Sequence, residues 1–308
     1  MTRHLSFAAL GALLVLGAGC RDATRVAEAP GVSSPAGVIP QRTKEQKAAL
    51  GRQHKTAWDL YQALKAEAKG GQTLAASMMP DWSGVYSRPA DKGFTFDPDL
   101  PAGVLTTAKL TSEYQAKLEK RVADVKRGIE WDPISTCAPP GHPRWLTEPF
   151  LREFVPTPKQ TWLINEMVND VRRVYTDGRD HVPAEDRYPL YNGDSIGFWD
   201  GGRLVVHTNQ LQGGIYQRSN PDYTDQVETV EIWQREGDTI TADVWVYDPP
   251  VLAEPWYVKQ VYGKLDPKQD LRIRYWNCAE NQNNAVHQTQ DGTTQFNGFT
   301  FDPTAVKK

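Results

Sequence analysis

Short segments that alternate between apolar and polar residues follow one another from residue 161 to residue 277. In the clearest of them Ile240, Ala242 and Val244 share one face, as alternate residues of a β-strand do. Turn signals separate the segments, and no helical pattern interrupts them, which argues against parallel βαβ units. Further strand candidates are residues 82–87, 161–167, 171–176, 203–208, 227–234, 257–263, 271–276 and 294–301. We therefore expect a mainly β fold, an antiparallel barrel (lipocalin-like) or sandwich of about ten strands, preceded by two helices.

Two helical patterns accompany the strands. Thr43 and Gln46 fit a capping box at the start of an N-terminal helix within residues 43–71. The apolar face of this helix carries Leu50, Tyr61 and Leu64. A second helix is predicted at about residues 111–127, inserted in a β domain that spans residues 72–308.

The first 20 residues have the pattern of an export signal. Arg3 precedes a short apolar run, which ends in small residues and Cys20. This ending is similar to the lipobox of bacterial lipoproteins, in which the cysteine is lipidated; the alternative is plain secretion with cleavage after residues 27–29. Residues 21–42 are rich in Pro, Gly and Ser and predict a flexible tether. We expect an exported, periplasmic protein that Cys20 anchors to the outer membrane.

Charge and motif content exclude several classes of function. A formal charge of −3 at pH 7 gives no reason to expect a nucleic-acid partner. The sequence contains no Walker loop, dinucleotide fingerprint or nucleophile elbow, so we expect no cofactor. Its 6 histidines offer no closely spaced ligand pair, so we expect no metal site. The lipid anchor is the only expected membrane contact, and the sequence predicts no particular protein partner.

Two cysteines remain once Cys20 is assigned to the leader, namely Cys137 and Cys278. An even number of thiols in an exported chain is most simply a disulfide. A metal-binding or nucleophilic role would need partners at ligand spacing, and no His or other Cys stands close to Cys278 in the sequence. We therefore expect a Cys137–Cys278 disulfide.

The densest polar cluster covers residues 172–181. Alternation along a strand places Arg173 and Tyr175 on one face, and Asp177 begins the following turn. Arg173, with Tyr175 beside it, can bind a carboxylate or a sugar, and Asp177 and His181 can act as acid and base. The alternative is a solvated hairpin turn with an internal arginine–aspartate pair.

A hairpin is predicted at residues 200–202, where Asp-Gly-Gly joins two strands. The first strand carries Asp194, a candidate ligand-binding residue. The second carries His207, which follows three apolar residues and so lies on or beside the core. His207 can serve as a general base, because histidine titrates near neutral pH, or it can be a core histidine that a backbone group satisfies.

Glu231 shares a strand face with Thr229 and Trp233. If this face lines a barrel interior, the carboxylate is partly desolvated and its pKa rises, which would suit an acid or base. If the face is exposed, Glu231 pairs with a cation on a neighbouring strand. The candidate cations are Lys259, Arg272 and Arg274.

All 10 tryptophans lie beyond residue 57, in the β body and the helix before it. Aromatic rings form flat platforms for sugars and other planar ligands, but they also fill the cores of β proteins. Most of the rings are expected in the core. Three are candidates for ligand contact, namely Trp199, Trp233 and Trp256.

Three segments carry specific motifs: residues 137–144 (CAPPGHPR), 172–179 (RRVYTDGR) and 193–199 (GDSIGFW). With them, about residues 80–285 resemble a family of uncharacterised exported proteins and lipoproteins of Gram-negative bacteria. The resemblance implies export and a Cys137–Cys278 pair, and it implies no reaction. Many members carry Asp where this chain has His207, so the resemblance does not support an essential base there.

Three functions are compatible with this sequence. The leading hypothesis is a β-barrel protein that binds a small, partly apolar or aromatic/sugar ligand in the periplasm. The alternative is a cofactor-independent lyase, isomerase or hydrolase that uses acid and base residues at the barrel interior. The third is an envelope interaction protein, which would expose the apolar stripe of the N-terminal helix.

Overall fold

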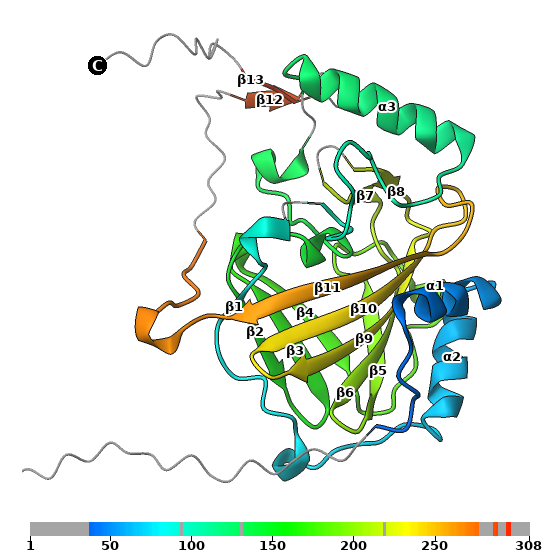
Figure 1. The fold of residues 1–308 in the computed structure, drawn as a ribbon, viewed down its shortest axis with the longest axis vertical. Helices are drawn as coiled ribbons and strands as arrows, with labels where there is room; N and C mark the ends of the chain where they lie inside the picture. Colours follow the sequence, from blue (N-terminus) through cyan, green and yellow to red (C-terminus); the bar gives the residue numbers. More distant parts are fainter. Residues whose placement is uncertain are drawn as a thin grey trace, which may run out of the picture. The chain divides into compact units, whose positions relative to one another are not determined.

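Nine strands close into a barrel in the computed structural model of this chain (Figure 1). The structure describes residues 37–92, 95–129, 132–217, 220–276, 286–288 and 294–296. The barrel strands are β1 (Tyr86–Ser87), β2 (Arg152–Pro156), β3 (Gln160–Asn165), β4 (Asp170–Tyr175), β5 (Asp194–Asp200), β6 (Arg203–Asn209), β9 (Glu228–Glu236), β10 (Thr239–Tyr247) and β11 (Trp256–Lys264). The predicted mainly β, lipocalin-like barrel is confirmed.

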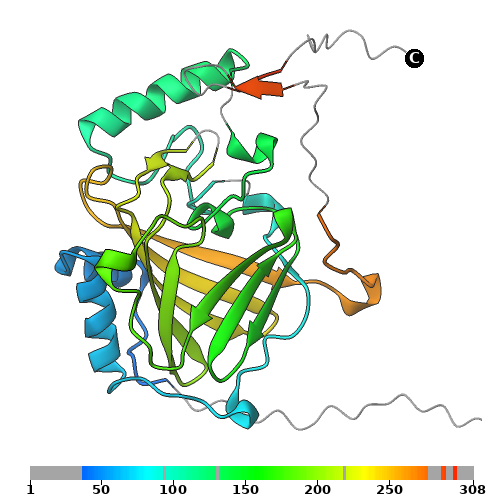
Figure 2. The same ribbon diagram turned by 180° about the vertical axis from the view of Figure 1, so that it is seen from behind.

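The strands follow the order β1-β11-β10-β9-β6-β5-β4-β3-β2, and β1 pairs with β2 to close the ring. Figure 1 shows the wall of β9, β10 and β11, and Figure 2 shows the barrel from behind. One pair departs from the antiparallel expectation, because β4 and β5 run parallel through Val174↔Ser195 and Tyr175↔Ile196. Since β5 begins beside the end of β4, residues 176–193 connect the two strands without an α-helix.

Alternation along each strand separates an inner face from an outer one. Ile240, Ala242 and Val244 of β10 belong to the apolar core inside the barrel. Trp245 and Tyr247 of the same strand instead join a second apolar cluster, which packs against the N-terminal helices. The two faces that the sequence pattern predicts for this strand are therefore present.

Residues 271–276 differ from the prediction, since they form no strand. On one side β11 pairs with β10 along most of its length, and on the other it pairs with β1 at Gly263 and Lys264, where the ring closes. A closed barrel has no free edge that another strand could extend. The hairpin predicted at residues 200–202 is present between β5 and β6.

The N-terminal helical stretch, predicted as one helix within residues 43–71, forms two helices. They are α1 (Lys44–Gln53) and α2 (Ala57–Glu67). The capping box of Thr43 and Gln46 begins α1 as predicted, and Thr56 begins α2 by accepting a hydrogen bond from the backbone N–H of Asp59. This second N-cap explains the break, because an N-cap residue has a non-helical backbone.

The apolar stripe of these helices is buried. Leu50, Tyr61 and Leu64 pack with residues of the outer barrel wall, among them Val205 and Val230. The stripe is therefore covered by the chain's own barrel. The interaction-protein hypothesis requires an exposed stripe, so this observation does not support it.

The remaining described elements lie outside the barrel. They are α3 (Ser112–Lys126), β7 (Gly214–Ile215), β8 (Asp222–Tyr223), β12 (Val286–Gln288), β13 (Thr294–Phe296) and the short 3-10 turns at Ala76–Met78, Ala90–Lys92, Pro133–Thr136, Arg144–Leu146, Met167–Asn169, Ala184–Asp186 and Pro267–Gln269. The helix expected at about residues 111–127 corresponds to α3. No helix in these described ranges is both long and apolar enough to cross a bilayer. The predicted signal peptide with Cys20, and Cys278, lie outside the described residues.

Candidate functional site

An ion pair lies inside the barrel. Arg172 of β4 and Glu231 of β9 are at most 1% exposed. Arg172 donates hydrogen bonds of 2.8 and 2.7 Å to the two oxygens of Glu231. It also donates to the hydroxyls of Ser195 on β5 and Thr208 on β6, so the polar groups follow the inner wall across four strands. We call Arg172, Glu231 and the groups bonded to them the interior network.

His142 completes the interior network from the segment ahead of β2. Its Nε2 lies 2.8 Å from Thr229 Oγ1 and 3.1 Å from Glu231 Oε1. Burial, together with the charge of Arg172, lowers the pKa of His142 to about 4. Burial alone would raise the pKa of Glu231, but Arg172 and His142 outweigh it and hold that pKa well below its ordinary value. The predicted rise in the pKa of Glu231 is therefore wrong, because Glu231 has a buried cationic partner.

Aromatic rings pack beside this network. The Trp233 ring stacks on Tyr262 with centroids 5.8 Å apart and lies 5.6 Å from Phe154, and its Nε1 donates to Glu231. Glu231 therefore accepts hydrogen bonds from several donors and has no role left as a proton carrier. The interior network links β4, β5, β6 and β9 through buried hydrogen bonds, and both oxygens of Glu231 are engaged in it.

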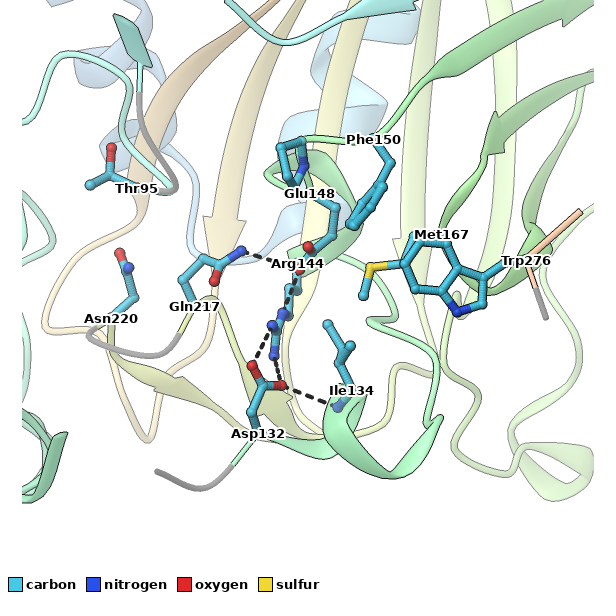
Figure 3. Close-up of a pocket in the computed structure, with 11 residues that line it drawn as sticks. Thr95, Asp132, Ile134, Arg144, Glu148, Phe150, Met167, Gln217, Asn220 and Trp276 are labelled. Carbon is cyan, nitrogen blue, oxygen red and sulfur yellow. Dashed lines mark hydrogen bonds and ion pairs between the residues drawn. The ribbon is translucent and has the colours of Figure 1, made fainter. Parts of the chain in front are cut away.

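A cavity of about 570 Å³ lies at the end of the barrel where β2 begins (Figure 3). We call it the barrel-end cavity. Its lining residues are Thr95, Asp132, Ile134, Arg144, Glu148, Pro149, Phe150, Met167, Gln217, Asn220 and Trp276. Phe150 and Trp276 meet edge to face with ring centroids 4.9 Å apart. Figure 3 shows Phe150, Met167 and Trp276 on one side of Arg144, and Thr95 and Asn220 on the other.

Buried charges form the polar wall of the barrel-end cavity. Arg144 donates to both oxygens of Asp132 at 2.8 and 3.1 Å and to Glu148 Oε1 at 2.7 Å. Gln217 Nε2 also donates to Glu148 Oε1, at 3.2 Å. Burial raises the pKa of Glu148, although Arg144 opposes the rise. This wall combines a fixed ion-pair network with a carboxyl group that desolvation has made more basic.

A second polar feature lies on the outer wall of the barrel. Asp194, His181, His207 and Glu228 form a continuous row, which we call the histidine chain. His181 Nδ1 lies 2.7 Å from Asp194 Oδ2, and His181 Nε2 lies 2.7 Å from His207 Nδ1. His207 Nε2 lies 3.3 Å from Glu228 Oε2. The connection between β4 and β5 supplies His181, β5 supplies Asp194, and β6 and β9 supply the other two.

Helix α2 covers the histidine chain. The rings of Trp58 and Tyr61 lie 5.2 and 5.6 Å from the His207 ring, centroid to centroid. Burial lowers the pKa of His207, with Glu228 opposing the effect. Burial also pushes the pKa of Asp194 upward, but hydrogen bonds from His181 and from the backbone N–H of Val182 outweigh it and the pKa is lowered. His207 is thus a buried histidine whose hydrogen-bond partners are side chains, where the sequence suggested a backbone partner.

Only one proton fits between His181 Nε2 and His207 Nδ1, because one nitrogen must accept what the other donates. Replacing His181 by Ala leaves His207 Nδ1 buried without its partner. We expect His181→Ala to lower the free energy of unfolding by about 1–3 kcal/mol. Urea denaturation at neutral pH measures the change.

Arg179→Ala is the matched control for His181→Ala. Arg179 lies in the same connection and forms an exposed ion pair of 2.7 Å with Asp177. Exposed pairs contribute little, so Arg179→Ala should change the free energy of unfolding by less than about 0.5 kcal/mol. Equal effects of the two variants would show that the histidine chain adds nothing to stability.

The other candidates of the polar cluster are dispersed. Arg173 is exposed on the outer face of β4, next to the buried Arg172. Tyr175 carries the guanidinium of Arg179 on its ring, 4.0 Å from the centroid, and Asp177 is exposed in its pair with Arg179. This part of the cluster is a solvated turn with an internal arginine–aspartate pair, as the alternative hypothesis states.

The three tryptophan candidates are core residues. Trp199 is fully buried beside Trp82, with ring centroids 5.6 Å apart. Trp256 donates its Nε1 to Thr107 and packs against Phe96, and Trp233 belongs to the interior network. Among the described residues, none of the three lines the barrel-end cavity, in which Trp276 is the tryptophan.

Several site residues were not predicted from the sequence, namely Asp132, Arg144, Glu148 and Arg172. Arg144 and Glu148 are four residues apart and both flank a tryptophan-containing segment, which is a weak signal of a paired site. Asp132 reaches the same site through the fold, and no spacing in the sequence marks it. The Cys137–Cys278 disulfide stays a prediction, because Cys278 lies outside the described residues.

The chain matches no protein-family model, no curated protein and no solved structure. Within the described ranges, no three or more His, Cys, Asp and Glu side chains are arranged to hold a metal ion. Among the described residues, the barrel-end cavity and the histidine chain are two candidate sites.

Proposed function

We propose that this protein is an exported barrel, anchored to the outer membrane through Cys20, that binds a small, partly apolar ligand in the barrel-end cavity. The observation that carries the proposal is the cavity itself. Its volume of about 570 Å³ falls in the range of sites for small organic ligands. Its apolar and aromatic wall faces a small set of fixed polar groups, which is the usual composition of such sites.

Binding is favoured over catalysis by where the polar residues lie. Glu231 is committed to Arg172, and Asp177 and Arg173 face solvent. His181 and His207 do meet, but they lie beneath α2 on the outer wall and do not line the barrel-end cavity. The acid and base groups of the enzyme hypothesis therefore do not converge on the cavity that would hold a substrate.

The proposal predicts that the barrel-end cavity binds a neutral apolar probe such as N-phenylnaphthylamine, whose fluorescence rises in an apolar site. Phe150→Ala removes an aromatic wall of the cavity and should raise the Kd for the probe about tenfold. Tyr188→Ala is the control, because Tyr188 is 64% exposed and lies outside the cavity. No fluorescence gain, or equal effects of the two variants, would contradict binding at this site. Native mass spectrometry of protein purified from its source would then identify a retained ligand.

A further inference from the structure

Arg144 offers little to an anionic ligand in the barrel-end cavity. Each of its three guanidinium nitrogens already donates to a carboxylate, Nε to Glu148 and the two Nη atoms to Asp132. The side chain is also 4% exposed. A carboxylate or phosphate on a ligand would compete for this guanidinium with the two carboxylates that already pair with it.

Some oxygen atoms of the same wall accept no hydrogen bond from the described residues. Glu148 Oε1 accepts from both Arg144 and Gln217. Glu148 Oε2 accepts no hydrogen bond from the described residues. It is also not among the fully buried polar atoms that lack a partner, so a ligand can reach it. Gln217 Oε1 likewise accepts no hydrogen bond from the described residues and is not among the fully buried polar atoms that lack a partner. The cavity therefore presents hydrogen-bond acceptors, which suit a ligand that donates.

Two further cations among the described residues lie near this wall but point elsewhere. Arg88 donates to the backbone oxygens of Thr147 and Thr95. Arg152 donates to the backbone oxygen of Glu148, and its guanidinium lies 4.4 Å from the Trp145 ring centroid. Neither arginine lines the cavity. Among the described residues, the charged side chains that do line it are Asp132, Glu148 and Arg144.

The aromatic wall suits the same kind of ligand. Phe150 and Trp276 meet edge to face at an interplanar angle of 85°, which leaves a ring face and a ring edge for contact. Ring faces attract cations as well as apolar groups. A cation on an apolar body can therefore contact both the acceptor wall and the aromatic wall.

We propose that the ligand of the barrel-end cavity carries a protonated amine on an apolar or aromatic body, with the amine on Glu148 Oε2. The inference rests on the proposed function, since it names the ligand class of the same cavity. Three compounds with one apolar body test it by isothermal titration calorimetry: naphthylethylamine, naphthylethanol and naphthylpropionate. We expect the amine to bind at least about tenfold more tightly than the alcohol, and the carboxylate to bind most weakly.

Glu148→Gln should remove most of the preference for the amine over the alcohol. The unmodified protein supplies a test that does not depend on the variant's folding. Because burial raises the pKa of Glu148, the carboxyl takes up a proton on acidification sooner than an ordinary glutamate does, and amine binding should weaken as pH falls from 7 while alcohol binding does not.

If all three compounds bind equally, or the carboxylate binds best, the inference is wrong and the proposed function stands. If none binds and N-phenylnaphthylamine does not bind either, the proposed function itself is wrong.

Discussion

Glu231→Leu should lower the free energy of unfolding by about 3–5 kcal/mol, which is a large part of the stability of a typical domain. The reason is that Arg172 would keep its charge inside the barrel after losing the carboxylate that accepts two of its hydrogen bonds. His142 and Trp233 would lose an acceptor as well. Urea denaturation measures the effect, with Glu236→Gln as the control. Glu236 lies in the same strand but its side chain is 54% exposed, so this change should be nearly neutral.

A double-mutant cycle separates the buried charge from the lost packing. Arg172→Met combined with Glu231→Leu removes both charges, so part of the stability lost in the single variant should return. We expect the sum of the two single-variant losses in the free energy of unfolding to exceed the loss in the double variant by about 2 kcal/mol. Additive effects would mean that Arg172 and Glu231 do not depend on each other, and would contradict the interior network.

The sequence predicted the barrel because alternation is a local property of each strand. It did not predict the partner of Glu231, because that partner depends on which strands the closed ring brings together. Arg172 and Arg173 are neighbours in the sequence, and only one of them can face inward. Arg172 shares its face with the buried Val174, so the alternation held a signal that pointed to the inner residue.

The two candidate sites show the same limit. His181 and His207 were both predicted as functional candidates, but their contact depends on the parallel pairing of β4 and β5, which places the intervening connection on the outer wall. The barrel-end cavity is lined by segments from Thr95 to Trp276. Residues so far apart in the sequence meet only through tertiary packing, which local patterns do not encode.

Acidification should destabilise the protein before any carboxylate of ordinary pKa is protonated, and His142 is the cause. Its pKa falls from 6.5 to about 4 in the folded protein, because the ring is buried beside Arg172. No described residue makes a hydrogen bond to its Nδ1, so a proton added there would be buried without an acceptor among the described residues. Below pH 6.5 the unfolded chain therefore takes up a proton that the folded chain refuses, and stability falls as pH falls.

The size of the effect follows from the two pKa values. Each tenfold rise in proton concentration between pH 6.5 and about 4 removes about 1.4 kcal/mol, so the loss from His142 alone is about 3 kcal/mol. The lowered pKa of His207 acts in the same direction. Glu231 adds its own loss only at lower pH, because its stabilising effect is complete above the pKa of an unfolded glutamate and disappears as pH falls toward its depressed folded value.

Urea denaturation at pH 7, 6, 5 and 4 tests this prediction. The free energy of unfolding should decline steadily between pH 6.5 and pH 4.5, and His142→Gln should make that part of the curve much flatter. Gln keeps a side-chain N–H that can donate to Thr229 or Glu231, but it takes up no proton in this range. If the free energy of unfolding depends on pH in the same way for the wild type and for His142→Gln between pH 7 and pH 5, His142 is free to take up a proton in the folded barrel. In that case water would reach the interior network, and His142 would carry a positive charge within it.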